Sequence, residues 1–312
     1  MPHKLMRMHR TDAAPRRPVM LAIAGDSAAG KTTITAGLVR ALGTDRCTAV
    51  CVDDYHRYDR GERKGLPFTP LHPDCNYVDI MEQHLQLLAT GHPVLKPVYD
   101  HHTGTLARPE YVEPREFVII EGLLPLHTKL AAACFDVTVY LNPPEDIRRE
   151  WKIKRDTGQR GYQPEQVLAE LGRREPESEA YIRPQRQRAD MVVRFAGISQ
   201  RHDPPGTPLS AELLLRPTIR HPDLSGILAD SGESMHLKLT RDEDGRPADT
   251  LHIHGYASRE SSRMLEKAIW EGLGGGGAGV PEFLGELGDG QRSEPLAITQ
   301  LLLLYHMLEA AR

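Results

Sequence analysis

The sequence predicts an α/β fold in which a parallel sheet carries helices on both faces. Five short apolar runs are typical of buried strands, and segments with helical spacing of apolar residues separate them. Such alternation favours parallel strands joined by helical crossovers. A glycine-rich stretch directly after the first run supports the same fold. The five runs lie at residues 19–25, 49–52, 117–121, 136–141 and 191–195.

The glycine-rich stretch, GDSAAGKT at residues 25–32, fits the pattern G-x-x-x-x-G-K-[ST]. In this pattern backbone N–H groups meet phosphate oxygens, the lysine reaches the β- and γ-phosphates, and the hydroxyl binds Mg²⁺. A helix with apolar spacing at Ile34, Leu38 and Leu42 follows the stretch, which completes the strand–loop–helix arrangement that binds phosphate. We therefore expect a P-loop NTPase-like sheet that binds ATP and Mg²⁺ through Gly25, Asp26, Ser27, Ala28, Ala29, Gly30, Lys31, Thr32 and Thr33.

Composition excludes several other classes of protein. The chain has 312 residues, is 39% hydrophobic and 26% charged, and carries a net charge of −4. This balance is typical of a globular protein and gives no electrostatic footprint for nucleic acid or an anionic membrane. The four cysteines show no metal-binding spacing, so we expect reduced thiols and a cytoplasmic location. The most apolar stretch, residues 295–308, is too short to cross a bilayer and predicts a buried helix.

Carboxylates follow two of the expected strands directly. Asp53 and Asp54 come after the second strand, and Glu121 ends the third. Ligands of open parallel sheets bind beyond the carboxyl ends of strands, so these acids are placed to meet substrate or Mg²⁺. The alternatives are helix capping by the aspartates and an incidental glutamate at a strand end. Further polar side chains follow the aspartates: Tyr55, His56, Arg57 and Arg60.

A helix expected at residues 145–156 carries a cationic flank. Ile147 and Trp151 form its apolar stripe, and Arg148, Lys152 and Arg155 line up beside that stripe. A solvated surface is the ordinary explanation of such a flank. Beside a P-loop, the same cations with the glycines at 158 and 161 suggest a lid-like segment that closes over phosphates.

The remaining elements are assigned by period and by turn residues. We expect a loop near the site at 60–76, and a helix at 79–90 that buries Ile80, Leu85 and Leu88. Residues 91–111 are expected to be a loop with short extended pieces, whose adjacent His101 and His102 diverge too much to bind zinc. Overall we predict a flexible lead at 1–17, a P-loop domain at 18–199, and a β-rich accessory region ending in helices at 209–312.

Several stretches resemble the phosphoribulokinase and uridine kinase family of P-loop kinases. The resemblance covers roughly residues 21–195, and residues 292–308 are similar to the end of some members. Beside the P-loop it is carried by CVDDYHRYDR (51–60), KPVYDHHTG (96–104), VIIEGLLP (118–125), WKIKRDTGQRG (151–161) and YIRPQRQRAD (181–190).

The resemblance implies a homodimeric enzyme that uses ATP and Mg²⁺ to phosphorylate D-ribulose 5-phosphate at its 1-hydroxyl, giving ribulose 1,5-bisphosphate and ADP. It implies Asp53 as the catalytic base, with Lys31 and Arg155 as further catalytic residues. Thr32, Glu121 and Asp53 would hold the metal. Binding of the small-molecule sugar phosphate would fall to His56, Arg60, Tyr99, Lys152, Arg155, Arg160 and Arg174.

The chain also departs from the family pattern. Plant-type members pair a cysteine of the P-loop with one before the aspartates. Here Ala29 occupies the first of these positions and Cys51 the second, so thioredoxin-type switching is not expected. Asp100 replaces a common asparagine, and residues 62–76 diverge. A uridine-type nucleoside kinase, a kinase of another pentose or sugar phosphate, and a non-catalytic nucleotide-binding protein therefore stay open as alternatives.

Overall fold

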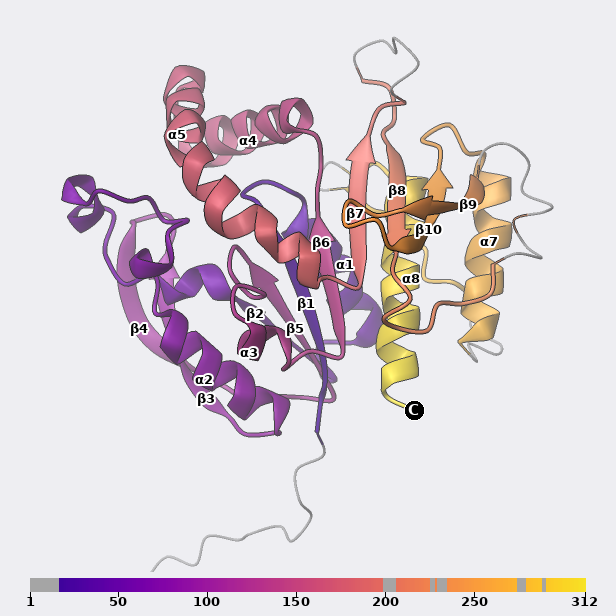
Figure 1. Ribbon diagram of the computed structural model, residues 1–312, viewed down its shortest axis with the longest axis horizontal. Coiled ribbons are helices and arrows are strands. Elements are labelled where there is room, and N and C mark those ends of the chain that lie inside the picture. Colours follow the sequence, from indigo (N-terminus) through magenta and orange to yellow (C-terminus); the bar gives the residue numbers. More distant parts are fainter. Residues whose placement is uncertain (1–16, 199–205, 225–227, 229–234, 274–278, 288–289) are drawn as a thin grey trace, which may run out of the picture.

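The computed structural model describes residues 17–198, 206–224, 228, 235–273, 279–287 and 290–312. Its centre is an eight-stranded sheet in the order β2-β5-β1-β6-β7-β8-β10-β9, and β3 and β4 form a separate two-stranded sheet (Figure 1). The strands are β1 (Val19–Gly25), β2 (Cys47–Cys51), β3 (Val94–Asp100), β4 (Thr105–Val112), β5 (Phe117–Gly122), β6 (Val137–Leu141), β7 (Met191–Ala196), β8 (Ser210–Leu215), β9 (Met235–Arg241) and β10 (Pro247–Ile253).

Helices cover both faces of the main sheet, as the sequence predicts. One face packs against α1 (Lys31–Leu42) and α8 (Glu294–Ala310), with α7 (Arg259–Gly272) beside α8. The other face packs against α2 (Val78–Ala89) and α3 (Lys129–Ala132). The remaining helices are α4 (Glu145–Arg160) and α5 (Pro164–Glu177), the π-helical turn η4 (Ser178–Ile182), and the 3-10 turns η1 (Val52–Tyr55), η2 (Glu62–Gly65), η3 (Pro73–Cys75) and η5 (Arg183–Arg188).

The five expected strands pair in parallel. β1 lies between β5 and β6, β2 pairs with β5, and β7 pairs with β6, all in parallel. All seven residues of β1 are buried, which explains why its sequence is a continuous apolar run rather than an alternating one. The parallel arrangement brings the carboxyl ends of β1, β2 and β5 to one edge, where the P-loop and the carboxylates lie.

The expectation for residues 91–111, a loop with short extended pieces, is only partly right, because β3 and β4 form a complete antiparallel hairpin there. Seven of the eight residues of β4 are exposed, so the hairpin has little of the alternating burial by which a strand is recognised in a sequence. In α2 the prediction for Ile80 is also wrong. Ile80 is 40% exposed and Met81 is buried instead, together with the correctly predicted Leu85 and Leu88.

The cationic flank of α4 faces the protein rather than solvent. Arg148 and Lys152 are 5% and 3% exposed, whereas the expected apolar stripe of Ile147 and Trp151 is only half-buried. Of the two interpretations that the sequence left open, a solvated surface does not apply to Arg148 and Lys152. Burial of the two cations is tolerated because carboxylates meet both of them.

The C-terminal strands continue the main sheet. β8 pairs antiparallel with β7, and β10 lies between β8 and β9. The division of the chain at residues 199–209 thus falls between two hydrogen-bonded strands, and as a domain boundary it stays a prediction. Residues 1–16 of the predicted lead, residues 199–205 at the division of the chain and residues 274–278 lie outside the described residues.

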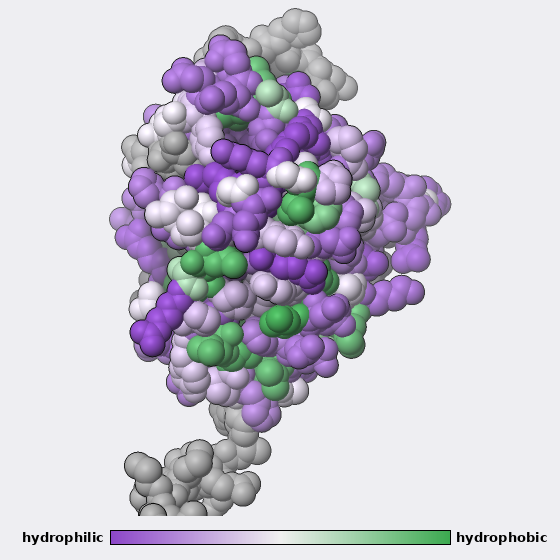
Figure 2. All heavy atoms as spheres, turned by 90° about the vertical axis from the view of Figure 1, so that its left-hand side faces the viewer, coloured by the Kyte–Doolittle hydropathy of each residue, from purple (hydrophilic) through white to green (hydrophobic). Residues whose placement is uncertain are grey.

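The sequence predicts that the apolar stretch at residues 295–308 is a buried helix, and α8 confirms it. α8 is buried over most of its length, and no helix in the described ranges is long and apolar enough to cross a membrane. On the face that carries the β3–β4 hairpin, hydrophobic residues form scattered groups among hydrophilic ones (Figure 2). The large exposed apolar side chains of the hairpin are Leu95, Leu106 and Tyr111.

Candidate active site

The P-loop joins the end of β1 to the start of α1. Gly30 precedes the helix with φ of 95°, a conformation that favours glycine. A Cβ on Gly25 would lie 2.8 Å from the carbonyl oxygen of Leu141, so only glycine allows the loop to leave the sheet at this point. The sequence prediction of a strand, a glycine loop and a helix is confirmed.

Lys31 and Thr32 are held by different partners, Lys31 by the backbone of the loop and Thr32 by strand β5. The ammonium of Lys31 donates to the carbonyls of Gly25 and Asp26, each at 2.9 Å. The hydroxyl of Thr32 donates to the carboxylate of Glu121 at 3.1 Å. The two side chains that the motif assigns to phosphate and Mg²⁺ are therefore ordered by the protein itself.

Asp53 and Glu121 lie close together beside the P-loop. The N–H of Leu123 donates to Asp53 Oδ1 at 2.8 Å, which fixes the carboxylate against the end of β5. Burial raises the pKa of Glu121, the Lys31 ammonium opposes this shift, and the negative charge of Asp53 raises the pKa further. The charges of Asp53 and Lys31 thus act in opposite directions on the pKa of Glu121.

Asp54, the second aspartate, holds the hairpin. Its carboxylate accepts from the buried ammonium of Lys96 and, at 3.2 Å, from the N–H of Tyr99. Both donors belong to β3. Asp54 therefore places the hairpin against η1, and Tyr99 beside the site.

His56 is a buried neutral side chain. Both hydrogens of the Asn76 amide are directed at carbonyls, those of Pro70 and His72, so the Asn76 oxygen accepts from His56 Nδ1–H at 2.7 Å. Burial lowers the pKa of His56 to about 4, despite the opposing charge of Asp53. His56 is thus uncharged near neutrality, and its ring lies edge-on to Tyr99 at 4.8 Å.

The cationic face of α4 covers the P-loop. A guanidinium nitrogen of Arg148 lies 3.3 Å from the Asp26 carboxylate and donates to the carbonyl of Ser27 at 3.3 Å. Arg155 donates to Ser27 Oγ at 3.4 Å and to Asp156 at 2.8 Å. These contacts bring two guanidinium groups to the loop that the motif assigns to phosphate.

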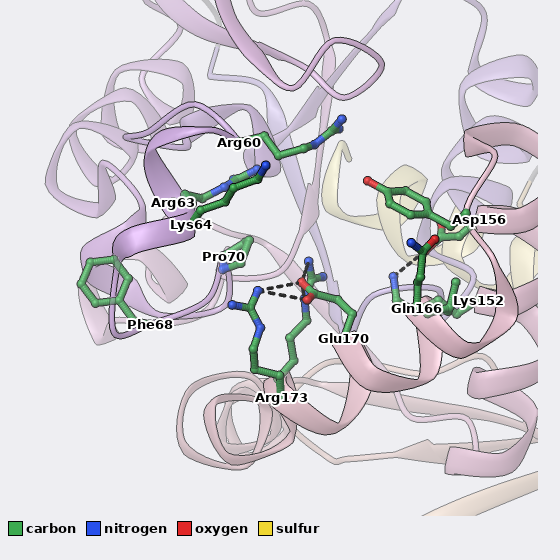
Figure 3. Close-up of a pocket in the computed structure, with 13 residues that line it drawn as sticks. Arg60, Arg63, Lys64, Phe68, Pro70, Lys152, Asp156, Gln166, Glu170 and Arg173 are labelled. Carbon is green, nitrogen blue, oxygen red and sulfur yellow. Dashed lines mark hydrogen bonds and ion pairs between the residues drawn. The ribbon is translucent and has the colours of Figure 1, made fainter.

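A pocket of about 320 Å³ opens between the 60–70 segment and helices α4 and α5 (Figure 3). Arg60, Arg63 and Lys64 extend from one side toward the helices, and Glu170 and Arg173 lie on the opposite side. Six cationic side chains and two carboxylates line it, so the pocket carries an excess of positive charge. The lining residues are Arg60, Arg63, Lys64, Phe68, Pro70, Lys152, Asp156, Tyr162, Gln166, Val167, Glu170, Arg173 and Arg174.

Asp156 connects this pocket to the P-loop. Its two carboxylate oxygens accept from Lys152 and Arg155, each at 2.8 Å. Lys152 lines the pocket, whereas Arg155 lies at Ser27 of the P-loop. Burial lowers the pKa of Lys152 to about 8, with the neighbouring charge of Arg174 acting in the same direction.

The sequence-predicted acceptor residues fall into two groups. Arg60, Lys152 and Arg174 line the pocket, and Arg60 also donates to the carbonyl of His101 at 2.6 Å. His56 and Tyr99 form a buried wall beside Asp53. The side chain of Arg160, at the end of α4, lies outside the described residues.

Sequence reasoning missed Arg63, Lys64 and Arg173 as pocket residues. Arg63 donates to the phenol oxygen of Tyr99 and lies 4.8 Å from the centre of its ring. The sequence signal for Arg63 and Lys64 was weak, because both lie in residues 62–76, where the chain diverges from the family pattern. Arg173 was visible only as a basic residue near a helix end.

The residues beside the P-loop fit a magnesium ion. Mg²⁺ is bound through one or two carboxylates plus substrate phosphates, and it keeps several waters. Thr32, Glu121 and Asp53 offer a hydroxyl and two carboxylates, all hard oxygen donors. In the parts of the chain that the structure describes, no cluster of three or more His, Cys, Asp or Glu side chains could hold a metal by itself.

All four cysteines are free thiols. Burial raises the pKa of Cys51 well above its usual range, and the charges of Asp53 and Glu121 act in the same direction. Cys51 is therefore a poor nucleophile, and Ala29 removes the P-loop partner that a disulfide would need.

Replacing Gly122 with alanine should disturb the Asp53 carboxylate. A Cβ at this position would lie 2.4 Å from Cγ2 of Val52 and 2.9 Å from Asp53 Oδ1, and φ is 153°. We expect at least a tenfold fall in kcat and a lower Tm. The control is Gly197→Ala, where a Cβ meets nothing within 4 Å. Unchanged kcat in the Gly122 variant would show that the position of Asp53 does not matter.

Together, a parallel sheet covered on both faces, a loop of this geometry and acids at neighbouring strand ends define a P-loop protein of the kinase-like type. The family model for the phosphoribulokinase / uridine kinase family matches residues 20–200. The chain belongs to this family.

The chain is similar to phosphoribulokinases and to uridine kinases. It is 42% identical to phosphoribulokinase of Synechocystis sp. over 177 residues, which are 57% of this chain and 53% of the relative. It is 32% identical over 204 residues to the chloroplastic phosphoribulokinase of Triticum aestivum, covering 60% and 50% of the two chains. It is 30% identical over 190 residues to uridine kinase of Oceanobacillus iheyensis, covering 58% and 89%.

The chain thus spans about half the length of the phosphoribulokinases it matches. Among solved structures, phosphoribulokinase from Rhodobacter spheroides superposes with a TM-score of 0.60 at 15% identity. The superposition covers 82% of this chain and 96% of that one. It supports the fold, including the C-terminal strands and helices.

Proposed function

We propose that this chain is a kinase that transfers the γ-phosphoryl group of ATP to the 1-hydroxyl of D-ribulose 5-phosphate, giving ribulose 1,5-bisphosphate and ADP. The observation that carries this proposal is the cationic pocket joined to the P-loop through Asp156. Such a pocket can hold an acceptor that is already phosphorylated while its hydroxyl meets the nucleotide. The similarity to phosphoribulokinases supports the same reaction.

The transfer needs a proton acceptor and positive charge rather than covalent chemistry. The acceptor hydroxyl oxygen forms a bond to the γ-phosphorus, its proton passes to Asp53, and the bond from the γ-phosphorus to the bridging oxygen breaks to release ADP. Lys31 and Arg155 balance the charge on the phosphates. Bound Mg²⁺ would neutralise phosphate charge beside Thr32 and Glu121.

The charge of the pocket supports a phosphorylated acceptor. A phosphate monoester carries about −1.5 to −2 at pH 7, and the lining cations outnumber the carboxylates six to two. Two of these cations, Arg173 and Arg174, are partly neutralised by Glu170, at 3.0 and 2.6 Å. We assign the acceptor phosphate to Arg60, Arg63 and Lys64, together with Lys152, whose partner Asp156 is also bound by Arg155.

A uridine-type nucleoside kinase is the second candidate. By sequence, the match covers 89% of the length of the uridine kinase, against 53% and 50% of the phosphoribulokinases from Synechocystis sp. and Triticum aestivum. Phe68 and Tyr162 supply aromatic rings to the pocket wall. An uncharged nucleoside, however, would leave the cations without an anionic partner, which is unfavourable in a partly buried site.

The test is the release of ADP, measured by a coupled assay with ribulose 5-phosphate, unphosphorylated ribulose, ribose 5-phosphate and uridine. We expect ribulose 5-phosphate to have the highest kcat/KM. Ribulose should be poorer by about 10³–10⁵-fold, because its use leaves charged groups of the site unpaired. A preference for uridine would favour the second candidate, and a preference for ribose 5-phosphate would reassign the sugar. No turnover with any acceptor would refute the proposed reaction.

A further inference from the structure

A buried glutamine joins the C-terminal helix to the helix that follows the P-loop. Gln300 of α8 is 1% exposed. Its Nε2 donates to the carbonyl of Thr33 in the first turn of α1 at 3.1 Å, and its Oε1 accepts from the N–H of Gly285 at 2.8 Å. Burying an amide is unfavourable unless both ends are hydrogen-bonded, and here both are. The side chain therefore fixes three segments relative to one another.

Gly37 of α1 makes room for this side chain. A Cβ at Gly37 would lie 2.1 Å from Nε2 of Gln300 and 2.5 Å from its Cδ. Glycine inside a helix is less stable than alanine, and nothing in the helical backbone at this position requires it. The close approach of Gln300 supplies the reason for a glycine here.

A second contact holds the other end of α1. Arg40, in the last turn, lies 2.6 Å from the Glu286 carboxylate and 4.2 Å from the centre of the Phe283 ring. The contacts of Gln300 and of residues 283–286 thus hold α1 near both of its ends, and α8 lies beside α1 (Figure 1). All these partners of α1 lie beyond residue 200, outside the part of the chain that matches the family model.

We propose that Gln300 is a positioning residue for the nucleotide site, and that with Gly37 it sets the placement of the P-loop helix and hence the affinity for ATP. The inference rests on the proposed use of ATP. Backbone N–H groups at the N-terminus of such a helix are directed at the phosphates, and hydrogen bonds weaken steeply when their geometry changes. Thr33 directly follows Lys31 and Thr32, so a displacement at its carbonyl is transmitted to both.

The test is a double-mutant cycle of Gln300→Ala and Gly37→Ala in the full chain. The dissociation constant of Mg·ATP is measured by calorimetry well below the Tm of each variant, together with KM for ATP and for the acceptor. We expect each single variant to weaken ATP binding about 5- to 10-fold, with the KM of the acceptor changed less than twofold. In the Gln300→Ala background the Gly37→Ala change should add less than twofold, because the shortened side chain leaves room for the new methyl group.

The control is Gly272→Ala, a helical glycine whose added Cβ would meet nothing within 4 Å. It should leave ATP binding unchanged. If Gln300→Ala does not fold, Gln300→Met keeps the length of the side chain while removing both hydrogen bonds, and the same 5- to 10-fold loss is expected. A lower Tm with unchanged ATP binding would show a purely structural contact and overturn the inference. Equal effects of Gly37→Ala in both backgrounds would also overturn it. If the wild-type chain bound no ATP, the proposed function would fail first, which the wild-type titration alone reveals.

Discussion

Replacing Asp53 with asparagine should lower kcat by about 10²–10⁴-fold, the range that a general base contributes. The asparagine oxygen can still accept the hydrogen bond that the Leu123 N–H donates to Asp53 at 2.8 Å, so the local structure is kept. What is lost is the group that takes the proton from the attacking hydroxyl. ATP binding should change much less than kcat, because the contacts of Lys31 and of the P-loop backbone remain and Glu121 keeps a carboxylate for Mg²⁺.

The matched control is Asp74→Asn, since the Asp74 side chain is 74% exposed on η3. It should have wild-type kcat. The measurements are steady-state kinetics and calorimetric titration with Mg·ATP. A rate within threefold of wild type in the Asp53 variant would remove this residue as the base, whatever its effect on binding.

Replacing Lys152 with methionine should lower kcat/KM for the phosphorylated acceptor by about 10²–10³-fold, since truncating one partner of a buried charge contact costs about 2–5 kcal/mol. Lys152 is 3% exposed and lines the cationic pocket, and methionine has a similar length. Asp156 keeps its contact with Arg155, so the helix is not left with an unpaired buried carboxylate. Affinity for ATP should be nearly unchanged.

The lowered pKa of Lys152 also predicts how kcat/KM for the acceptor depends on pH. Burial lowers the pKa of Lys152 to about 8, so the ammonium is charged below this pH and loses its proton above it. In the wild type, kcat/KM for the acceptor should therefore be highest below pH 8 and fall as the pH rises above 8, because this ratio reports ionisations of the free enzyme. The methionine variant should show a low rate without that decline.

Lys154→Met serves as the control for charge. Lys154 lies on the same helix but is exposed, and it does not line the pocket. It should keep both the rate and the alkaline decline of the wild type. An alkaline decline that persists in the Lys152 variant, or an equal loss in the Lys154 variant, would argue against a phosphate contact by Lys152.

The parts of the fold that could be predicted from the sequence are those whose pattern depends only on residues close together in the chain. The parallel strands β1, β5, β6 and β7 are buried along almost all of their length, so each is a nearly continuous apolar run, whereas the edge strand β2 is only partly buried. The loop at residues 25–32 carries its glycines, lysine and threonine at fixed spacing. The hairpin of β3 and β4 could not be predicted in the same way, because β4 is exposed along most of its length and has no regular apolar period.

For the candidate site, the sequence indicated Asp53, Glu121 and the cations of α4, but not which way those cations face. Arg148 and Lys152 are buried because Asp26 and Asp156 meet them, and Asp26 is more than a hundred residues away from Arg148. Arg63 contacts Tyr99 of the hairpin, 36 residues further along the chain, and no local pattern indicated that contact.

The sequence by itself determined that this chain has a phosphate-binding loop at the edge of a parallel sheet, since local spacing and apolar period depend on residues close together in the chain. Only the tertiary structure decided how the charges pair, where the cationic pocket opens, and that Gln300 reaches the P-loop helix. Such contacts join residues far apart in the chain, and their energies depend on burial and distance, which no local pattern encodes.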